Sequence, residues 1–269
     1  MEFPYFQGNV INIFTDASTT TNFNARVMAV CSGFIAVQNN HVIASDYKIF
    51  NGATSQFAEL YAMMMALTFM NYDVWSKRYS GRCEEVNNSI YNLFSDSLYA
   101  IEAMKGNVLK WVTRTNTAIN NYTHPTYNYD PNVPPDLLKP KHNTKKKKNS
   151  SGSDKLVVVP NQEVILHCMG LIIYTQKKIN LYHIKGHMNE HSDNGLEYAR
   201  NMFKSKNNVV PNDNIIKNLI HWNNIIDNST REHLMKVMSY DDKIPTTVQW
   251  PVKFYPTLEQ QCMYKNYVR

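Results

Sequence analysis

Apolar residues near the start of the chain form three short runs separated by polar connections. The runs are VINIFTDAS, which begins at Val10, RVMAVCSGFIAV at 26–37 and HVIASDYKIF at 41–50. Short apolar runs bounded by turn-prone residues such as Asn39 are typical of β-strands. The pattern therefore predicts three strands in an antiparallel meander, the first of which ends at Asp16.

The spacing of apolar residues then changes to a helical period. SQFAELYAMMMAL has apolar side chains three or four residues apart, which predicts a helix from about Gln56 to Tyr72 with Ser55 as its N-terminal cap. Glu59 lies in the first turn of this helix. The run IYNLFSDS predicts a fourth strand that ends at Asp96, and LYAIEAM after it has a helical pattern.

Regular patterning weakens between residues 106 and 160. Several prolines interrupt this segment, and KPKHNTKKKKNSSGSDK within it is low-complexity polar sequence. We interpret 106–160 as an insertion whose Lys-rich part, 123–155, is mobile.

After the insertion, NQEVILHCMGLIIYTQ predicts a helix, INLYHIKGH a fifth strand, and SDNGLEYARNMF a helix that begins at Asp193. The remaining sequence predicts one helix near 214–226, a second near 230–238 and an extended tail. We expect a main domain at 1–205 and a C-terminal extension at 206–269 that packs on it.

The charge of the chain is concentrated in one place. The sequence has 269 residues, a formal net charge of +6, 43% hydrophobic and 19% charged residues, which excludes a collagen, a coiled coil and a fully disordered chain. Seven lysines and one acidic residue lie between Lys139 and Lys155, so this arm carries the whole net charge. A lysine run of this kind is either a solvated loop or a salt-sensitive contact to nucleic acid.

Cysteine spacing and the N-terminal sequence bear on the compartment. The four cysteines form no CxxC pair and no dense disulfide framework. MEFPYFQGNVINIF lacks the pattern of a signal peptide, and no stretch approaches the ~18 apolar residues of a membrane span. We therefore expect a cytoplasmic protein with no membrane partner. Its high Asn and Lys content is compatible with the A/T-rich genome of a virus or phage in a host cell.

Two acids follow apolar strands in the same way. If the first and fourth strands are neighbours, Asp16 and Asp96 emerge side by side at one edge of the sheet, where α/β sheets place their active sites. Gathered carboxylates repel each other unless a cation lies among them, and oxygen ligands select hard ions such as Mg²⁺ or Mn²⁺. Two such ions ~3.5–4 Å apart can clamp the attacking and leaving oxygens of a phosphodiester. The pattern therefore favours metal-assisted phosphodiester hydrolysis.

Four segments, NIFTDAS, SQFAELYAMMMAL, LFSDSLYA and HIKGHMNEHSDNGLEYA, occur in an order that resembles the type 1 ribonuclease H family. The resemblance covers roughly residues 9–204 without the insertion. It implies an α/β fold with a mixed five-stranded sheet, an antiparallel meander plus parallel strands, flanked by helices. It also implies an endoribonuclease that hydrolyses the RNA strand of RNA–DNA hybrids with two Mg²⁺ ions, for which Mn²⁺ can substitute.

The resemblance assigns a role to each acid. Asp16 would bridge both metal ions, Glu59 and Asp96 would complete one site, and Asp193 would complete the other. His187 of the KGH motif would assist proton transfer or product release. Only MNEHS separates His187 from Asp193, which is shorter than is usual in the family, so His191 is an alternative to His187.

Two further segments are candidates for contacts to nucleic acid. Thr54, Ser55 and Gln56 lie where the family contacts the nucleic-acid backbone near the 2′-hydroxyl groups that distinguish RNA from DNA. The lysines of the arm would add salt-sensitive affinity without sequence readout. They are Lys145, Lys146, Lys147 and Lys148.

Three other interpretations are weighed against this one. His183, His187 and His191 recur every four residues and could be a zinc site, but His183 falls in a predicted strand, so helical spacing does not apply. A resolvase or transposase of the same fold would order its acids differently. A non-catalytic ribonuclease H-like module that binds nucleic acid or protein remains the alternative from another class, although such a module has no need to keep mutually repelling carboxylates.

Overall fold

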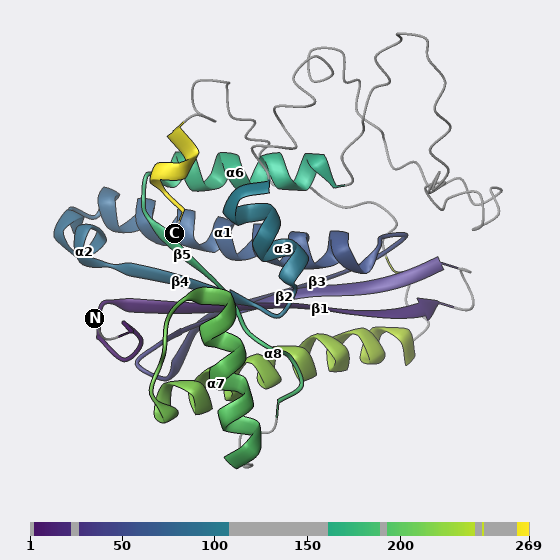
Figure 1. Ribbon diagram of the computed structural model, residues 1–269. Coiled ribbons are helices and arrows are strands. Elements are labelled where there is room, and N and C mark those ends of the chain that lie inside the picture. Colours follow the sequence, from purple (N-terminus) through teal and green to yellow (C-terminus); the bar gives the residue numbers. More distant parts are fainter. Residues whose placement is uncertain are drawn as a thin grey trace, which may run out of the picture.

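A five-stranded mixed sheet forms the centre of the computed structural model, which describes residues 3–22, 27–107, 161–188, 193–239, 244 and 263–268 (Figure 1). The strand order is β3-β2-β1-β4-β5. β1 (Val10–Asn22), β2 (Val27–Gln38) and β3 (His41–Asn51) form the antiparallel meander, and β4 (Ile90–Ser95) and β5 (Ile179–His183) lie parallel to β1. This arrangement confirms the predicted mixed sheet.

β1 continues past Asp16, where the sequence pattern predicted its end. Its antiparallel pairing with β2 extends to Asn22, whereas its parallel pairing with β4 stops at Thr15 and Ser95. The prediction of the strand end was wrong because the hairpin with β2 holds the extended backbone beyond the last parallel contact. Asp16 is therefore the first residue at which β1 has lost its parallel neighbour.

α1 (Ser55–Tyr79) is longer than predicted and begins with a different cap. The hydroxyl of Thr54, whose backbone is extended, accepts a hydrogen bond of 3.2 Å from the backbone N–H of Phe57, so Thr54 caps the helix and Ser55 is its first residue. The helix continues because no proline or glycine occurs before Gly81, which has a positive φ of 75°. The short helix α2 (Cys83–Asn88) then leads to β4.

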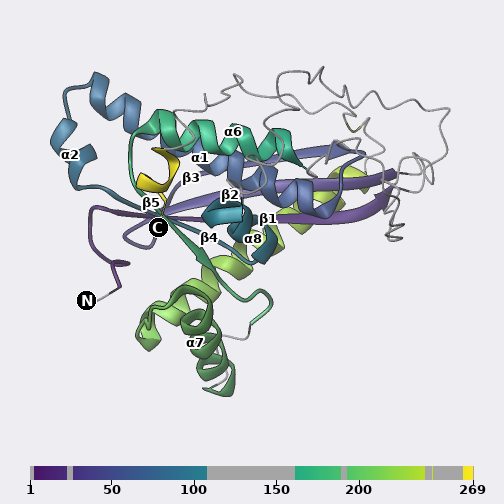
Figure 2. The ribbon, with the colours of Figure 1, turned by 45° about the horizontal axis from the view of Figure 1, so that its top comes forward.

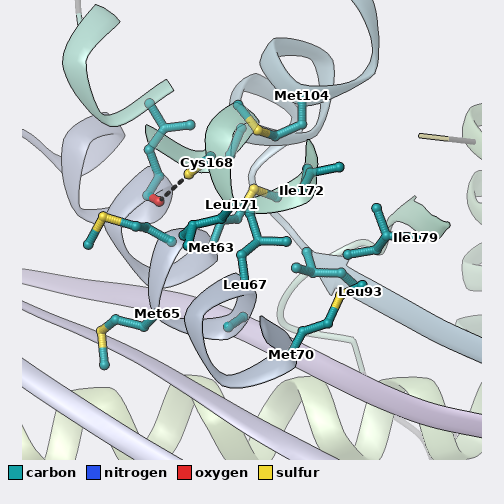
Figure 3. Packing of buried hydrophobic residues seen from close by; sticks show 14 of the residues in the cluster. Met63, Met65, Leu67, Met70, Leu93, Met104, Cys168, Leu171, Ile172 and Ile179 are labelled. Atoms are coloured by element: carbon teal, nitrogen blue, oxygen red, sulfur yellow. Dashed lines mark hydrogen bonds between the residues drawn. The ribbon is translucent and has the colours of Figure 1, made fainter. Parts of the chain in front are cut away.

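One face of the sheet is covered by α1, and α6 (Gln162–Thr175) packs against α1, as Figures 1 and 2 show. Methionine and leucine side chains fill the space between these helices and the sheet, among them Met63, Leu67 and Met70 (Figure 3). The buried thiol of Cys168 on α6 donates a 3.8 Å hydrogen bond to the carbonyl of Leu60 on α1. This apolar layer fixes α1 over the sheet.

The opposite face is covered by α8 (Asp213–Ser239), and α7 (Asp193–Asn207) projects from the sheet beside it (Figures 1 and 2). The sequence pattern predicted two helices where α8 is one. The prediction was wrong because the polar segment DNST contains no helix-breaking proline or glycine. Thr230 in this segment is buried, and its hydroxyl donates a 2.9 Å hydrogen bond to the carbonyl of Asp227 within the helix.

Three short elements complete the structure. α3 (Leu98–Glu102) and the π-helical turn η1 (Ala103–Asn107) follow β4, and the 3₁₀ turn η2 (Tyr264–Asn266) lies near the C-terminus, with Val268 bridged to Ile179 of β5. Most of the predicted insertion, 108–160, lies outside the described residues. None of the helices in the described part of the chain is long and apolar enough to cross a membrane.

Candidate metal centre

Three of the four predicted acids meet at one point. Asp16 on β1, Glu59 on α1 and Asp96 after β4 each present a carboxylate oxygen, and these oxygens lie within 4.8 Å of one another. The three residues come from distant parts of the sequence and are joined because β1 and β4 are parallel neighbours and α1 packs across β1 and β2. The strand pattern predicted that Asp16 and Asp96 lie at one edge of the sheet, and the family resemblance added Glu59 to them.

Backbone contacts fix Asp16 and Glu59. Asp16 is paired with Gly33 of β2, and its Oδ1 accepts a 2.8 Å hydrogen bond from the backbone N–H of Ala17. The start of α1 is tied to β2 because the hydroxyl of Ser32 donates a 2.7 Å hydrogen bond to the carbonyl of Ala58. Glu59 is the next residue, so this bond sets where its side chain begins.

Asp96 is held by the segment that follows β5. A ring nitrogen of His183, Nε2, is 3.1 Å from the carbonyl oxygen of Asp96. Gly186 lies so close to Asp96 that a Cβ added at Gly186 would overlap with Oδ2 of the aspartate. The KGH segment therefore passes so close to the carboxylate of Asp96 that a side chain at Gly186 would force one of the two to move.

Burial and mutual repulsion disfavour the charged forms of these acids. The pKa of Asp16 is raised to about 8, first by burial and then by the charge of Asp96. The pKa of Glu59 is raised well above its ordinary value by burial and by the charges of Asp16 and Asp96, and burial also raises the pKa of Asp96. The three acids are costly to ionise in the protein alone. A bound cation would stabilise their ionised forms.

The donor set fits a hard divalent cation. All three ligands are carboxylate oxygens, the type that Mg²⁺ and Mn²⁺ prefer. Oε2 of Glu59 is buried without a hydrogen-bond partner, which is costly for a carboxylate unless a cation takes the partner's place.

A fourth carboxylate, which the sequence analysis did not single out, approaches this cluster from α8. Asp227 is one of the groups that raise the pKa of Asp16, through its charge and through a contact between the two side chains, and its charge also raises the pKa of Glu59 and of Asp96. The sequence analysis missed Asp227 because it placed a break between two helices there. The available signal was the buried stripe that continues through the segment at the spacing of one helix; its members include Leu219, Asn223, Thr230 and Leu234.

The structure places His187 beside Asp227. Nδ1 of His187 is 3.3 Å from Oδ2 of Asp227, and the histidine side chain is largely exposed. A positive charge on His187 would partly offset the rise in the pKa of Asp96. His191 and the side chain of Asp193 lie outside the described residues, so their roles stay predictions.

The predicted nucleic-acid contacts fall in two classes. Thr54 caps the N-terminus of α1, the helix that carries Glu59. The side chains of Thr54, Ser55 and Gln56 are exposed there. The four lysines 145–148 lie outside the described residues. The zinc hypothesis also stays untested, although His183 contacts the carbonyl of Asp96 whereas His187 faces Asp227.

Comparisons with solved structures give distant similarities. LC11-RNase H1, isolated from compost by a metagenomic approach, is 17% identical over 36% of this chain and 61% of its own, with a TM-score of 0.28. The N-terminal RNase H domain of a Mycobacterium tuberculosis protein is 17% identical over 36% of this chain and 59% of its own, with a TM-score of 0.25. A foamy virus protease-reverse transcriptase in complex with dsDNA is 16% identical over 41% and 62%, with a TM-score of 0.30.

This chain thus spans about three fifths of the length of these relatives. No curated protein sequence matches it. The family model described as RNase H matches residues 8–199, a range that includes Asp16, Glu59, Asp96 and the KGH segment. The chain therefore belongs to the RNase H family.

Proposed function

We propose that the protein is a metal-dependent endoribonuclease that hydrolyses the RNA strand of RNA–DNA hybrids by a two-metal-ion mechanism. Membership of the RNase H family supports nuclease activity in general. The observation that carries the proposal further is the cluster of Asp16, Glu59 and Asp96, in which Oε2 of Glu59 is buried without a partner. Mg²⁺ is the proposed ion, and Mn²⁺ can replace it.

The residues of this chain supply the frame for that chemistry. Asp16 and Asp96 hold carboxylates at the edge where β1 and β4 part, and Glu59 reaches the same point from α1. Bound divalent ions would supply an activated water and neutralise the leaving oxygen. His187, exposed beside the cluster, is placed to take or give a proton at the ring nitrogen that does not face Asp227.

Substrate selection is assigned to the surface around the acids. Membership of the RNase H family supports binding of nucleic acid in general. The exposed side chains of Thr54, Ser55 and Gln56 are proposed to contact the backbone of the hybrid at the start of α1. Lysines 145–148 are proposed to add salt-dependent attraction to phosphates.

The proposal is tested by cleavage of a labelled RNA–DNA hybrid, with duplex RNA and single strands as comparison substrates. We expect Mg²⁺-dependent cleavage of the RNA strand of the hybrid by the natural protein and no cleavage by Asp96→Asn, which keeps the side-chain shape. Glu84→Gln changes the charge by the same amount on an exposed residue of α2 and should keep full activity. Hybrid binding without cleavage by any of the three proteins would instead favour the non-catalytic binding module.

A further inference from the structure

We propose that Asp227 on α8 is the fourth carboxylate of the metal centre and takes the position that the family resemblance gives to Asp193. The inference rests on the proposed function, because it concerns the same cations. Asp227 lies beyond residue 199, where the family match ends, so nothing in that match assigns it a role.

The orientation of β1 gives the first argument. Ser18 faces α8, since its hydroxyl is 2.9 Å from the hydroxyl of Thr230, and Phe14 packs in the cluster that contains Leu219 and Ile220 of α8. Side chains of a strand alternate between its two faces, so Asp16, midway between Phe14 and Ser18, is on the face of the sheet that α8 covers.

The register of α8 gives the second argument. Asp227 precedes Thr230 by three residues, and residues three apart lie side by side on one face of a helix. The bond between Thr230 and Ser18 therefore sets Asp227 beside the neighbouring position on the strand, which is Asp16. The contribution of the Asp227 side chain to the raised pKa of Asp16 agrees with this placement.

The backbone of β2 allows α8 to come this close. Gly33 is the residue paired with Asp16, and a Cβ at Gly33 would stand 3.0 Å from Cγ2 of Thr230 and closer still to the ring of Tyr47. A larger residue at Gly33 would therefore crowd Thr230 and Tyr47. Glycine at this position keeps α8 within reach of the acid cluster.

The partners of Asp227 orient it without neutralising the other acids. Its carboxylate is 3.0 Å and 3.3 Å from the guanidinium of Arg231, one turn along α8, and 3.3 Å from His187. The buried Oε2 of Glu59 still has no partner. Two carboxylates in contact repel each other unless a proton or a cation lies between them. Four carboxylates together would therefore bind a divalent ion more strongly than Asp227 alone.

The geometry of α7 sets Asp193 apart from this point. Asn207, the last residue of α7, is bonded through its side chain to the backbone N–H and carbonyl of His183, at distances of 2.9 Å and 2.8 Å. His183 in turn contacts Asp96. The end of α7 is thus anchored near the acids, and its first residue, Asp193, lies one helix length away from that anchor, about 21 Å at ~1.5 Å per residue.

Binding of Mn²⁺, measured by calorimetric titration of the full chain, tests the inference without relying on activity. We expect Asp227→Asn to weaken Mn²⁺ binding about tenfold or more, since even groups that only support a ligand change affinity by ~10–100-fold. Glu232→Gln, an exposed residue of the same helix, is the matched control and should bind as the natural protein does. Asp227→Ser is a second variant if the amide perturbs α8, and circular dichroism checks that each variant is folded.

The outcomes separate this inference from the proposed function. If Asp16→Asn and Asp193→Asn weaken Mn²⁺ binding while Asp227→Asn does not, Asp227 is not a ligand and the inference is overturned, although the metal centre stands. If Asp16→Asn also binds like the natural protein, the metal centre itself fails. Asp227 is supported as the fourth carboxylate if Asp16→Asn and Asp227→Asn both weaken Mn²⁺ binding. Both variants should then also show a smaller Mg²⁺-induced rise in melting temperature.

Discussion

Ser18 on β1 and Thr230 on α8 are joined by a 2.9 Å hydrogen bond between their hydroxyl groups, across 212 residues of sequence. Both residues lie next to the acids of the candidate site, Ser18 two positions from Asp16 and Thr230 three from Asp227. This bond therefore links the position of α8 on the sheet to the geometry of the metal centre.

We predict that Ser18→Ala and Thr230→Val are coupled. Each substitution should lower the free energy of unfolding by about 1 kcal/mol because a buried hydrogen bond is lost. The double variant should lose less than the sum of the two, since both remove the same bond, and denaturant unfolding of the four proteins measures this difference. Strictly additive losses would mean that the bond does not hold α8 in place.

Gly186→Ala should disable the site while the fold is kept. The added methyl group would overlap with Oδ2 of Asp96 and move that carboxylate. A displacement of about 1 Å can cost ~100-fold in rate, so we expect hybrid cleavage to fall by about this factor with little change in melting temperature. Gly8→Ala is the control, because the nearest atom to its new Cβ is 4.0 Å away. Equal cleavage by Gly186→Ala and the natural protein would contradict the placement of Asp96.

The stability of the metal-free protein should fall as pH rises. The pKa of Asp16 is raised to about 8 in the folded protein by burial and by the charges of Asp96 and Asp227, whereas it is ~3.9 in an unfolded chain. Between these values the folded state binds more protons than the unfolded state, so its stability decreases with increasing pH. The raised pKa of Glu59 acts in the same direction.

Melting temperatures measured in EDTA between about pH 4 and pH 8 check this expectation. Mg²⁺ should reduce the decline, because a cation stabilises the ionised carboxylates that repel each other in its absence. Asp16→Asn is the control, and its decline in EDTA should be smaller than that of the natural protein. A metal-free melting temperature that changes with pH in the same way in the natural protein and in Asp16→Asn would contradict the raised pKa.

His187→Gln should slow cleavage more than it weakens metal binding. The ring is exposed beside Asp227, where it can move a proton but has no place among the three oxygens of the cluster. General acid–base groups raise reaction rates about 100-fold or more. We therefore expect the cleavage rate to fall by about that factor while the affinity for Mn²⁺ stays nearly unchanged. Single-turnover cleavage and calorimetry on the same sample separate the two effects, and an unchanged rate would remove His187 from the reaction.

Replacement of lysines 145–148 by alanine should flatten the salt dependence of hybrid binding. Each phosphate contact adds close to one unit to the slope of log affinity against log salt, so fewer contacts give a shallower line. Fluorescence anisotropy at several salt concentrations measures this slope for the natural protein and the variant. An unchanged slope would show that the lysine arm does not contact the substrate.

The sequence predicted most of the sheet and two of the acids for a physical reason, whereas Glu59 was predicted from the family resemblance. Apolar runs of strand length and their order depend on local patterning, and parallel neighbours necessarily bring Asp16 and Asp96 to one edge. The end of β1 was mispredicted because strand length depends on the partner, and β2 continues after β4 has ended.

Asp227 shows why the rest could not be predicted locally. The segment DNST resembles a loop when it is considered alone, since Asp, Asn, Ser and Thr favour turns. In the structure two of these residues face β1, because Thr230 bonds Ser18 and Asp227 lies beside Asp16. The partner of a polar residue in the buried stripe of a helix can come from a distant strand, which periodicity does not reveal.

The proposal of a metal-dependent hydrolase is tested most directly by single-turnover cleavage of a labelled RNA–DNA hybrid. The rate is measured as a function of Mg²⁺ concentration for the natural protein and for Asp16→Asn. We predict cleavage of the RNA strand that is absent in EDTA and rises with Mg²⁺ for the natural protein, and a rate at least ~100-fold lower for Asp16→Asn at every concentration. Cleavage that persists in EDTA, or equal rates for the two proteins, would contradict the account.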